Sequence, residues 1–480
     1  MSLKQKTIGG LFWTFSQQFS SQIIGFGVSV IIARILSPAE FGLIGMLGIF
    51  IAVGNSLMDT GMTSSLIRSV DADQRDYSTV FVINMAASIF IYGIIYFAAP
   101  YIAAFYGHAV LEDIVRVYAL SFVFTAFRGV QAAKLTKEMK FKVQMMIQIP
   151  SVILGGTVGI VCAYAGYGVW SLVYMYVFQA FVFSIQHWFY SGWRPDLKFD
   201  YERFKYHFNF GYKITLSGLI TTVYQNIFTV IIGKYFSAAQ LGYYTRALSL
   251  RQLPISNLSA ALSKVTYPLF SSIHDNDVKL KEVYRRLIQQ VIFWIVPFLI
   301  LLMVIAEPLI RFLLTEKWLP AVPYFQILCV AGMLYPLQSY NYNIIKVKGR
   351  TDITLKMQIV KKTLGIAGIF IAIPYGIYGL LYFQIISAVI DYYLDAYYGG
   401  RMINYSMPEQ LKDIFPSVSL AVIIGLAAWQ IDLFLFRMYS LNDLSRMIIG
   451  GLIYFASYLG ISLGMKMSPA VDFKKLVLKQ

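Results

Sequence analysis

Long apolar stretches dominate the chain and predict a bundle of membrane-spanning helices. A spanning helix needs about 20 mostly apolar residues, and about fourteen stretches of this kind follow one another with short polar connections. Their centres lie near Gly25, Ala52, Phe90, Phe122, Gly156, Tyr176, Thr222, Ser256, Phe298, Gly332, Ile369, Ser387, Leu426 and Phe455. No connection has the length or the apolar content of a soluble module. The pattern therefore predicts an all-α integral membrane protein.

The composition excludes an ordinary soluble protein. Only 13% of the 480 residues are charged and 58% are hydrophobic, whereas about 25% are charged in typical soluble domains. The first apolar stretch continues to Leu36 without a small-residue cleavage site, which makes it too long for the apolar core of a signal peptide. We therefore expect it to be retained as the first membrane helix.

The positive charges alternate between the two sides of the predicted bundle. If the N-terminus is cytoplasmic, 29 Lys and Arg residues lie on the cytoplasmic side, 7 lie on the outer side and 4 fall within helices. Cytoplasmic loops carry such an excess, so we expect both termini to be cytoplasmic. Because the net charge of +16 is spread over alternate loops and forms no stripe beside stacking aromatics, we predict no nucleic-acid partner.

A twelve-residue segment recurs at an offset of 200 residues and indicates an internal duplication. Residues 31–42 and 231–242 share five identical positions, and Arg34 corresponds to Lys234. Six predicted helices separate the copies, so both halves have the same orientation, and parallel repeats of this kind place substrate sites between the halves. We therefore expect a six-helix lobe over 1–200, a second over 201–400, and an additional C-terminal helix pair with a basic tail over 401–480.

Polar residues form matching stripes on the first helix of each predicted lobe. Gln18 and Gln22 follow one face of the first helix, and Gln225 lies on the corresponding face of the seventh. Polar side chains in hydrocarbon either line a water-filled cavity or form hydrogen bonds between helices. Because the two stripes match, the cavity is favoured, and we predict that these glutamines contact the substrate.

Four cations fall within predicted helices of the second lobe: Arg246, Arg251, Lys361 and Lys362. A cation in hydrocarbon is costly unless it faces water or an anionic partner. Arg and Lys suit a phosphate or diphosphate group, so we predict that these four bind an anionic substrate. Alternatively, Lys361 and Lys362 extend to the cytoplasmic surface through their long side chains.

Acidic residues within the helices indicate ion coupling. Asp391 and Asp395 lie one turn apart on the twelfth predicted helix, and Asp59 lies on the second. Such carboxylates bind Na⁺ or carry a proton in transporters, so we predict that they couple transport to an ion gradient. A salt bridge from the Asp391 and Asp395 pair to Lys361 or Lys362 explains that pair equally well.

Enzymatic chemistry has little support in the sequence. The four histidines lack a metal-ligand spacing, and the two cysteines, Cys162 and Cys329, are too few and too far apart for a metal cluster or a disulfide framework. Phosphate-binding loops and nucleophile elbows are absent from the sequence. We therefore predict a protein that is not an enzyme, with no cofactor and no metal.

Several local motifs together resemble one family of membrane transporters. They are Lys6-Thr7-Ile8-x-Gly10-x-x-Trp13, Ala33-Arg34-x-Leu36-x-Pro38-x-x-Phe41-Gly42, Asp59-x-Gly61 followed by Leu66-Ile67-Arg68, and Thr315-Glu316-Lys317-Trp318. The chain resembles the polysaccharide transporters of the multidrug/oligosaccharidyl-lipid/polysaccharide (MOP) flippase superfamily, especially the Wzx-type exporters similar to colanic-acid and lipopolysaccharide biosynthesis proteins. The resemblance covers essentially the whole chain.

The resemblance implies a flippase of the bacterial cytoplasmic (inner) membrane. Such a protein translocates an undecaprenyl-diphosphate-linked oligosaccharide to the periplasmic leaflet by alternating access, for O-antigen or exopolysaccharide biosynthesis. The implied partners are this lipid-linked oligosaccharide, membrane lipid, and a polymerase and glycosyltransferases of the pathway. Related flippases place cavity arginines in the first helix, where this sequence has glutamines. Two alternatives remain, namely a cation-coupled multidrug exporter of the same superfamily and a membrane-embedded glycan-modifying enzyme.

Overall fold

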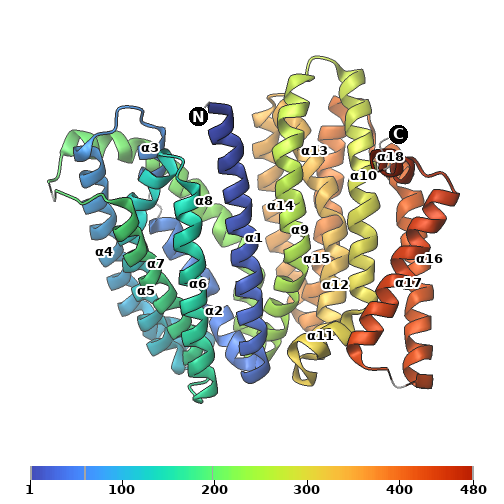
Figure 1. Cartoon of the computed structure of the whole chain (residues 1–480), viewed down its shortest axis with the longest axis horizontal. Helices are drawn as coiled ribbons and strands as arrows, with labels where there is room; N and C mark the ends of the chain where they lie inside the picture. Colours follow the sequence, from blue (N-terminus) through green and yellow to red (C-terminus); the bar gives the residue numbers. More distant parts are fainter. Residues whose placement is uncertain (1–2, 59–60, 197, 440, 478–480) are drawn as a thin grey trace. The chain divides into compact units, whose positions relative to one another are not determined.

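The structure is all-α, as the apolar pattern predicts. The computed structural model describes residues 3–58, 61–196, 198–439 and 441–477, and every regular element in these ranges is a helix (Figure 1). Each of the fourteen predicted centres falls within a helix of 13 residues or more. Ten segments of the described chain are long and apolar enough to cross a membrane. The count of fourteen spans therefore stays a prediction.

The chain divides into two compact units, residues 1–242 and 243–480. The lobe boundaries at residues 200 and 400 were predicted from the sequence repeat, and they stay a prediction. The first unit contains α1 (Leu3–Ile35), α2 (Pro38–Met58), α3 (Met62–Arg68), α4 (Gln74–Tyr106), α5 (Val110–Lys137), α6 (Phe141–Tyr164), α7 (Trp170–Ser191) and α8 (Tyr201–Tyr235). Within it, α5 packs against α4 and α7, α6 packs against α1 and α7, and α8 packs against α2.

The helix α9 (Ala238–Ser272) begins in the first unit and continues into the second. The remaining elements are α10 (Asp277–Val304), α11 (Ala306–Leu314), η1 (Glu316–Trp318), α12 (Ala321–Met333), α13 (Tyr335–Val347), α14 (Thr351–Ala372), η2 (Ile373–Tyr375), α15 (Gly376–Asp395), η3 (Ala396–Gly400), α16 (Met407–Tyr439), α17 (Asp443–Gly464) and α18 (Ser468–Val477). In the second unit, α15 packs against α12 and α14, and α10 packs against α12 and α16.

The duplicated segment forms the same turn in both copies. Helices α1 and α8 end at residues 35 and 235, and α2 and α9 begin at 38 and 238. The Ser37 backbone N–H donates to Glu40 Oε2 over 2.6 Å, and the Ser237 N–H donates to Gln240 Oε1 over 3.1 Å. In return, each serine Oγ accepts the backbone N–H of residue 40 or 240. This reciprocal capping box fixes where a helix starts, so the local structure supports a true duplication.

Candidate functional site

A buried ion pair lies between α14 and α15 in the second unit. Lys361 Nζ lies 2.6 Å from Asp395 Oδ2, and the two side chains are only 10% and 2% exposed. The other carboxylate oxygen, Asp395 Oδ1, is buried and has no hydrogen-bond partner. The pair is the salt bridge that the sequence analysis gave as one of two interpretations, and it leaves Asp395 Oδ1 without a partner.

The helix around Asp395 is irregular. Asp395 ends α15 and is followed by η3, a π-helical turn. In η3, a Cβ on Gly399 would lie 2.5 Å from the carbonyl oxygen of Asn341, so only glycine fits this approach of α13. Asp391 lies one turn before Asp395 on α15 and is half-buried. Because π-helical turns are rare and often occur at functional sites, the position of Asp395 beside one supports a functional role.

Arg251 is a second partly unsatisfied charge in the second unit. Its Nη1 donates to the backbone oxygen of Leu328 over 3.3 Å, and its Nη2 lies 3.5 Å from Gln252 Oε1. Its Nε is buried and has no partner. Within the described residues, Arg251 forms no ion pair with a carboxylate. A guanidinium held by neutral oxygens keeps its charge available for an anion.

Arg246 lies on the same helix in a different setting. Its guanidinium carbon is 5.9 Å from the centroid of the Trp318 ring, and its side chain is half-buried. Lys362, next to Lys361 on α14, is also half-buried. The structure therefore pairs Lys361 with Asp395 and places Arg246 beside Trp318.

The predicted glutamines are largely uncovered within the first unit. Gln18 on α1 and Gln225 on α8 are exposed, and Gln22 is half-buried. An uncovered polar side chain on a long apolar helix remains compatible with the predicted cavity. Asp59, predicted as an ion-coupling residue, lies outside the described residues.

Arg128 is a candidate that the sequence analysis missed, because it is one of the 29 cations counted on the cytoplasmic side. The structure places it within α5, nine residues before the helix ends, or about 13 Å along the axis. Its Nε is buried without a hydrogen-bond partner, and its guanidinium carbon lies 4.2 Å from the Phe183 ring centroid on α7. Helical side chains point toward the N-terminus, which here leads away from Lys137 and deeper into the bundle.

A cluster of polar side chains connects α8 to α3 and α4 in the first unit through hydrogen bonds and an ion pair. His207 Nδ1 lies 2.8 Å from Ser65 Oγ, and its Nε2 lies 3.2 Å from Asp76 Oδ1. Arg203 donates to Asp76 and, over 2.9 Å, to Asp73 Oδ2. Ser65, His207 and Asp76 are all buried, so this Ser-His-Asp set holds helices together and does not present a nucleophile to solvent.

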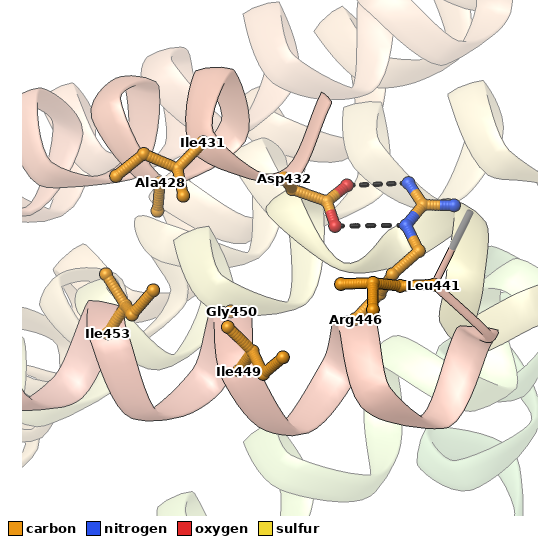
Figure 2. Close-up of a pocket in the computed structure, with 8 residues that line it drawn as sticks. All are labelled: Ala428, Ile431, Asp432, Leu441, Arg446, Ile449, Gly450 and Ile453. Carbon is orange, nitrogen blue, oxygen red and sulfur yellow. Dashed lines mark hydrogen bonds and ion pairs between the residues drawn. The ribbon is translucent and has the colours of Figure 1, made fainter. Parts of the chain in front are cut away.

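The C-terminal helix pair contains a buried salt bridge at the edge of a small pocket. Arg446 on α17 binds Asp432 on α16 through two hydrogen bonds, Nε to Oδ1 over 3.0 Å and Nη2 to Oδ2 over 2.6 Å (Figure 2). The rest of the pocket is apolar, lined by Ala428, Ile431, Leu441, Ile449, Gly450 and Ile453. Bidentate pairing of this kind fixes the two helices in one register.

Known proteins resemble this chain over most of its length. The family described as "Polysaccharide biosynthesis protein" matches residues 31–323, which is more than half of the chain. Lipopolysaccharide biosynthesis protein WzxC of Escherichia coli (strain K12) is 26% identical, and the match covers 82% of each chain. Teichuronic acid biosynthesis protein TuaB of Bacillus subtilis (strain 168) is 23% identical, and the match covers 90% of each.

Solved structures share the fold. An inward-closed structure of the lipid II flippase MurJ has a TM-score of 0.75 at 14% identity, covering 94% of this chain and 99% of the other. An inward-facing multidrug resistance MATE transporter of the MOP superfamily has a TM-score of 0.63 at 18% identity, covering 80% of this chain and 94% of the other. These likenesses confirm the expected MOP fold, and the chain belongs to the polysaccharide biosynthesis protein family of multi-pass membrane proteins.

Proposed function

We propose that the protein is a flippase that moves an undecaprenyl-diphosphate-linked oligosaccharide from the cytoplasmic to the periplasmic leaflet by alternating access. The family membership supports a role in surface polysaccharide biosynthesis. The structural observation that carries the proposal is Arg251, whose side chain lies against neutral oxygens and has no described carboxylate partner. A cation without a carboxylate partner on a predicted membrane helix is suited to bind an anionic headgroup.

The proposed substrate site uses the polar and cationic residues predicted from the sequence. The headgroup would be bound by Arg246, Arg251, Lys361 and Lys362, and the glycan by Gln18, Gln22 and Gln225. Ion coupling would use Asp391, Asp395 and Asp59. Burial of Lys361 and Asp395 supports their inclusion, because buried charges in a membrane protein are costly and serve function.

The proposed setting is the bacterial inner membrane with both termini cytoplasmic. The 29-to-7 distribution of cations supports this orientation. The proposed organisation is two six-helix lobes, 1–200 and 201–400, with the helix pair of 401–480 added. A polymerase and glycosyltransferases of the same pathway would supply and consume the lipid-linked glycan.

The multidrug exporter is the principal competitor, because the MATE fold is shared. Two relatives bear the names of polysaccharide biosynthesis proteins, which favours the glycan. The two hypotheses differ in the charge of their cargo. A diphosphate needs Arg251, whereas an exporter of cationic drugs depends on carboxylates such as Asp391.

Deletion of the gene tests the proposal directly. We expect an undecaprenyl-linked oligosaccharide to accumulate on the cytoplasmic side while surface polysaccharide falls, and its mass will identify the cargo. Complementation with Arg251→Ala or Arg246→Ala should restore export poorly at normal protein levels. Arg286→Ala is the matched control, because Arg286 is exposed and paired with Glu282 on α10. Unchanged lipids together with altered resistance to cationic drugs would favour the exporter.

A further inference from the structure

We propose that Lys361 is shared between Asp395 and the anionic group of the substrate, so that binding of the diphosphate is accompanied by protonation of Asp395. This inference rests on the proposed function, because it requires a phosphate-bearing cargo. It goes beyond that function by assigning the coupling step to one pair of side chains.

The geometry of the pair allows the Lys361 ammonium to exchange Asp395 for a phosphate as its partner. The ammonium is held by Asp395 Oδ2 over 2.6 Å, with one carboxylate oxygen engaged and the other, Oδ1, unpartnered. A lysine ammonium is a point charge on a flexible stem. It can turn from a carboxylate to a phosphate without rearrangement of the helix.

The loss of Lys361 would leave a buried carboxylate without its counter-charge. Within the described residues, Lys361 is the cation within 4 Å of Asp395. A second carboxylate, Asp391, lies one turn away on α15, and its negative charge would repel that of Asp395. Among the described residues, the hydroxyls of Tyr284 on α10 and Tyr342 on α13 also interact electrostatically with Asp395, and they supply no positive charge. Protonation is the direct way to remove this cost.

The exchange balances in atoms and in charge. In the resting pair, the Asp395 carboxylate and the Lys361 ammonium sum to zero. One phosphate oxygen arrives with one negative charge and one proton arrives from water. The proton forms an O–H bond on Asp395, and the ammonium pairs with the phosphate oxygen. The site therefore stays neutral, and an anion enters a low-dielectric region without adding uncompensated charge.

The backbone beside the pair is irregular at Asp395. Asp395 lies at the junction between α15 and the π-helical turn η3, where the hydrogen-bond register of the helix changes. Gly399 and Gly400 hold that turn against the backbones of Asn341 and Tyr405. Single π-helical turns frequently occur at functional sites.

The number of protons taken up on ligand binding tests whether Lys361 is shared and Asp395 is protonated. The full-length protein in detergent would be titrated with farnesyl diphosphate by calorimetry, in two buffers that differ in ionisation enthalpy. We expect about one proton to be taken up per diphosphate bound, and affinity to fall up to about tenfold per pH unit. Asp395→Asn should bind at least tenfold more tightly without proton uptake, because Lys361 is then free. Lys361→Met should bind more weakly, also without uptake.

Controls separate this inference from the proposed function. Lys356→Met, which removes an exposed lysine of the same helix, should behave as the wild type, and gel filtration should show each variant to be monodisperse. Wild-type binding without proton uptake, and an Asp395→Asn variant of unchanged affinity, would overturn the shared lysine and leave the flippase intact. A Na⁺ requirement in place of proton uptake would overturn the proton step. Failure of the wild type to bind the diphosphate would overturn both proposals.

Discussion

Gly42 and Gly242 occupy equivalent positions in the two repeats, and each packs against the backbone of the other repeat's turn. A Cβ on Gly42 would lie 1.7 Å from the carbonyl oxygen of Ala238, and a Cβ on Gly242 would lie 1.9 Å from that of Pro38. The contacts are reciprocal at the offset of 200 residues, so the two turns are related by a local pseudo-two-fold axis. Duplication explains why both glycines are needed.

Gly42→Ala is therefore expected to destabilise the protein, because the added methyl group meets backbone that cannot rotate away. Overpacking of this kind costs roughly 1–3 kcal/mol. Thermal unfolding of the purified protein in detergent measures the effect. Gly48→Ala is the matched control, because Gly48 lies on the same helix and a Cβ added there would have no neighbouring atom within 4 Å. Equal stability of the two variants would contradict the close contact.

The salt bridge between Arg446 and Asp432 predicts a strongly non-additive pair of substitutions. Arg446→Met leaves a buried carboxylate unpaired, which typically costs about 3–5 kcal/mol. Adding Asp432→Leu removes that charge and should recover most of the loss in the free energy of unfolding. Denaturation of the four proteins gives the coupling directly. If the double variant is as unstable as the sum of its single variants, the two side chains act independently.

The salt bridge between Arg446 and Asp432 shows what could and could not be predicted from the sequence. Apolar stretches of membrane length and the repeat are local patterns, so the helices and the paired turns could be predicted from them. The burial of Arg446 could not be predicted, because Arg446 is one of the 7 cations counted on the outer side. The structure leaves only 3% of it exposed. Its partner Asp432 is on another helix, and the packing of the two helices decides whether they meet.

The candidate site shows the same division. The helical phase of Asp391 and Asp395 indicated a common face, and a salt bridge to Lys361 or Lys362 was one of two interpretations. Only the relative position of α14 and α15 shows that Lys361 is the partner of Asp395. The π-helical turn after Asp395 also has no local signature beyond two adjacent glycines, because it depends on the approach of Asn341 and Tyr405.

His207→Ala should loosen the start of α8. The substitution removes the partner of Ser65 Oγ and of Asp76 Oδ1, while Asp76 Oδ2 keeps Arg203. An unsatisfied buried polar group costs about 1–3 kcal/mol. Hydrogen exchange at the first turns of α8 should become faster, with less change in α6. Lys205→Ala, on an exposed position two residues away, is the control and should leave exchange unaltered. Identical exchange in the two variants would mean that the cluster adds little to the attachment of α8.

The orientation of the chain can be tested at the two ends of α5. Ala109 and Lys140 are exposed residues just outside this helix, and the charge distribution predicts that Ala109 faces the periplasm and Lys140 the cytoplasm. In a background carrying Cys162→Ala and Cys329→Ala, a cysteine at position 109 should react in intact cells with a thiol reagent that cannot cross the inner membrane. A cysteine at position 140 should react only after permeabilisation.

The same labelling also tests what the charge bias means. Lys134 and Lys137 end α5 on the predicted cytoplasmic side, and an inverted pattern would place this basic turn in the periplasm, against the rule that fixes orientation in short-loop membrane proteins. With the predicted pattern, the proposed diphosphate cargo would arrive from the side on which 29 of the 40 cations were counted, and their attraction would raise its local concentration near the membrane.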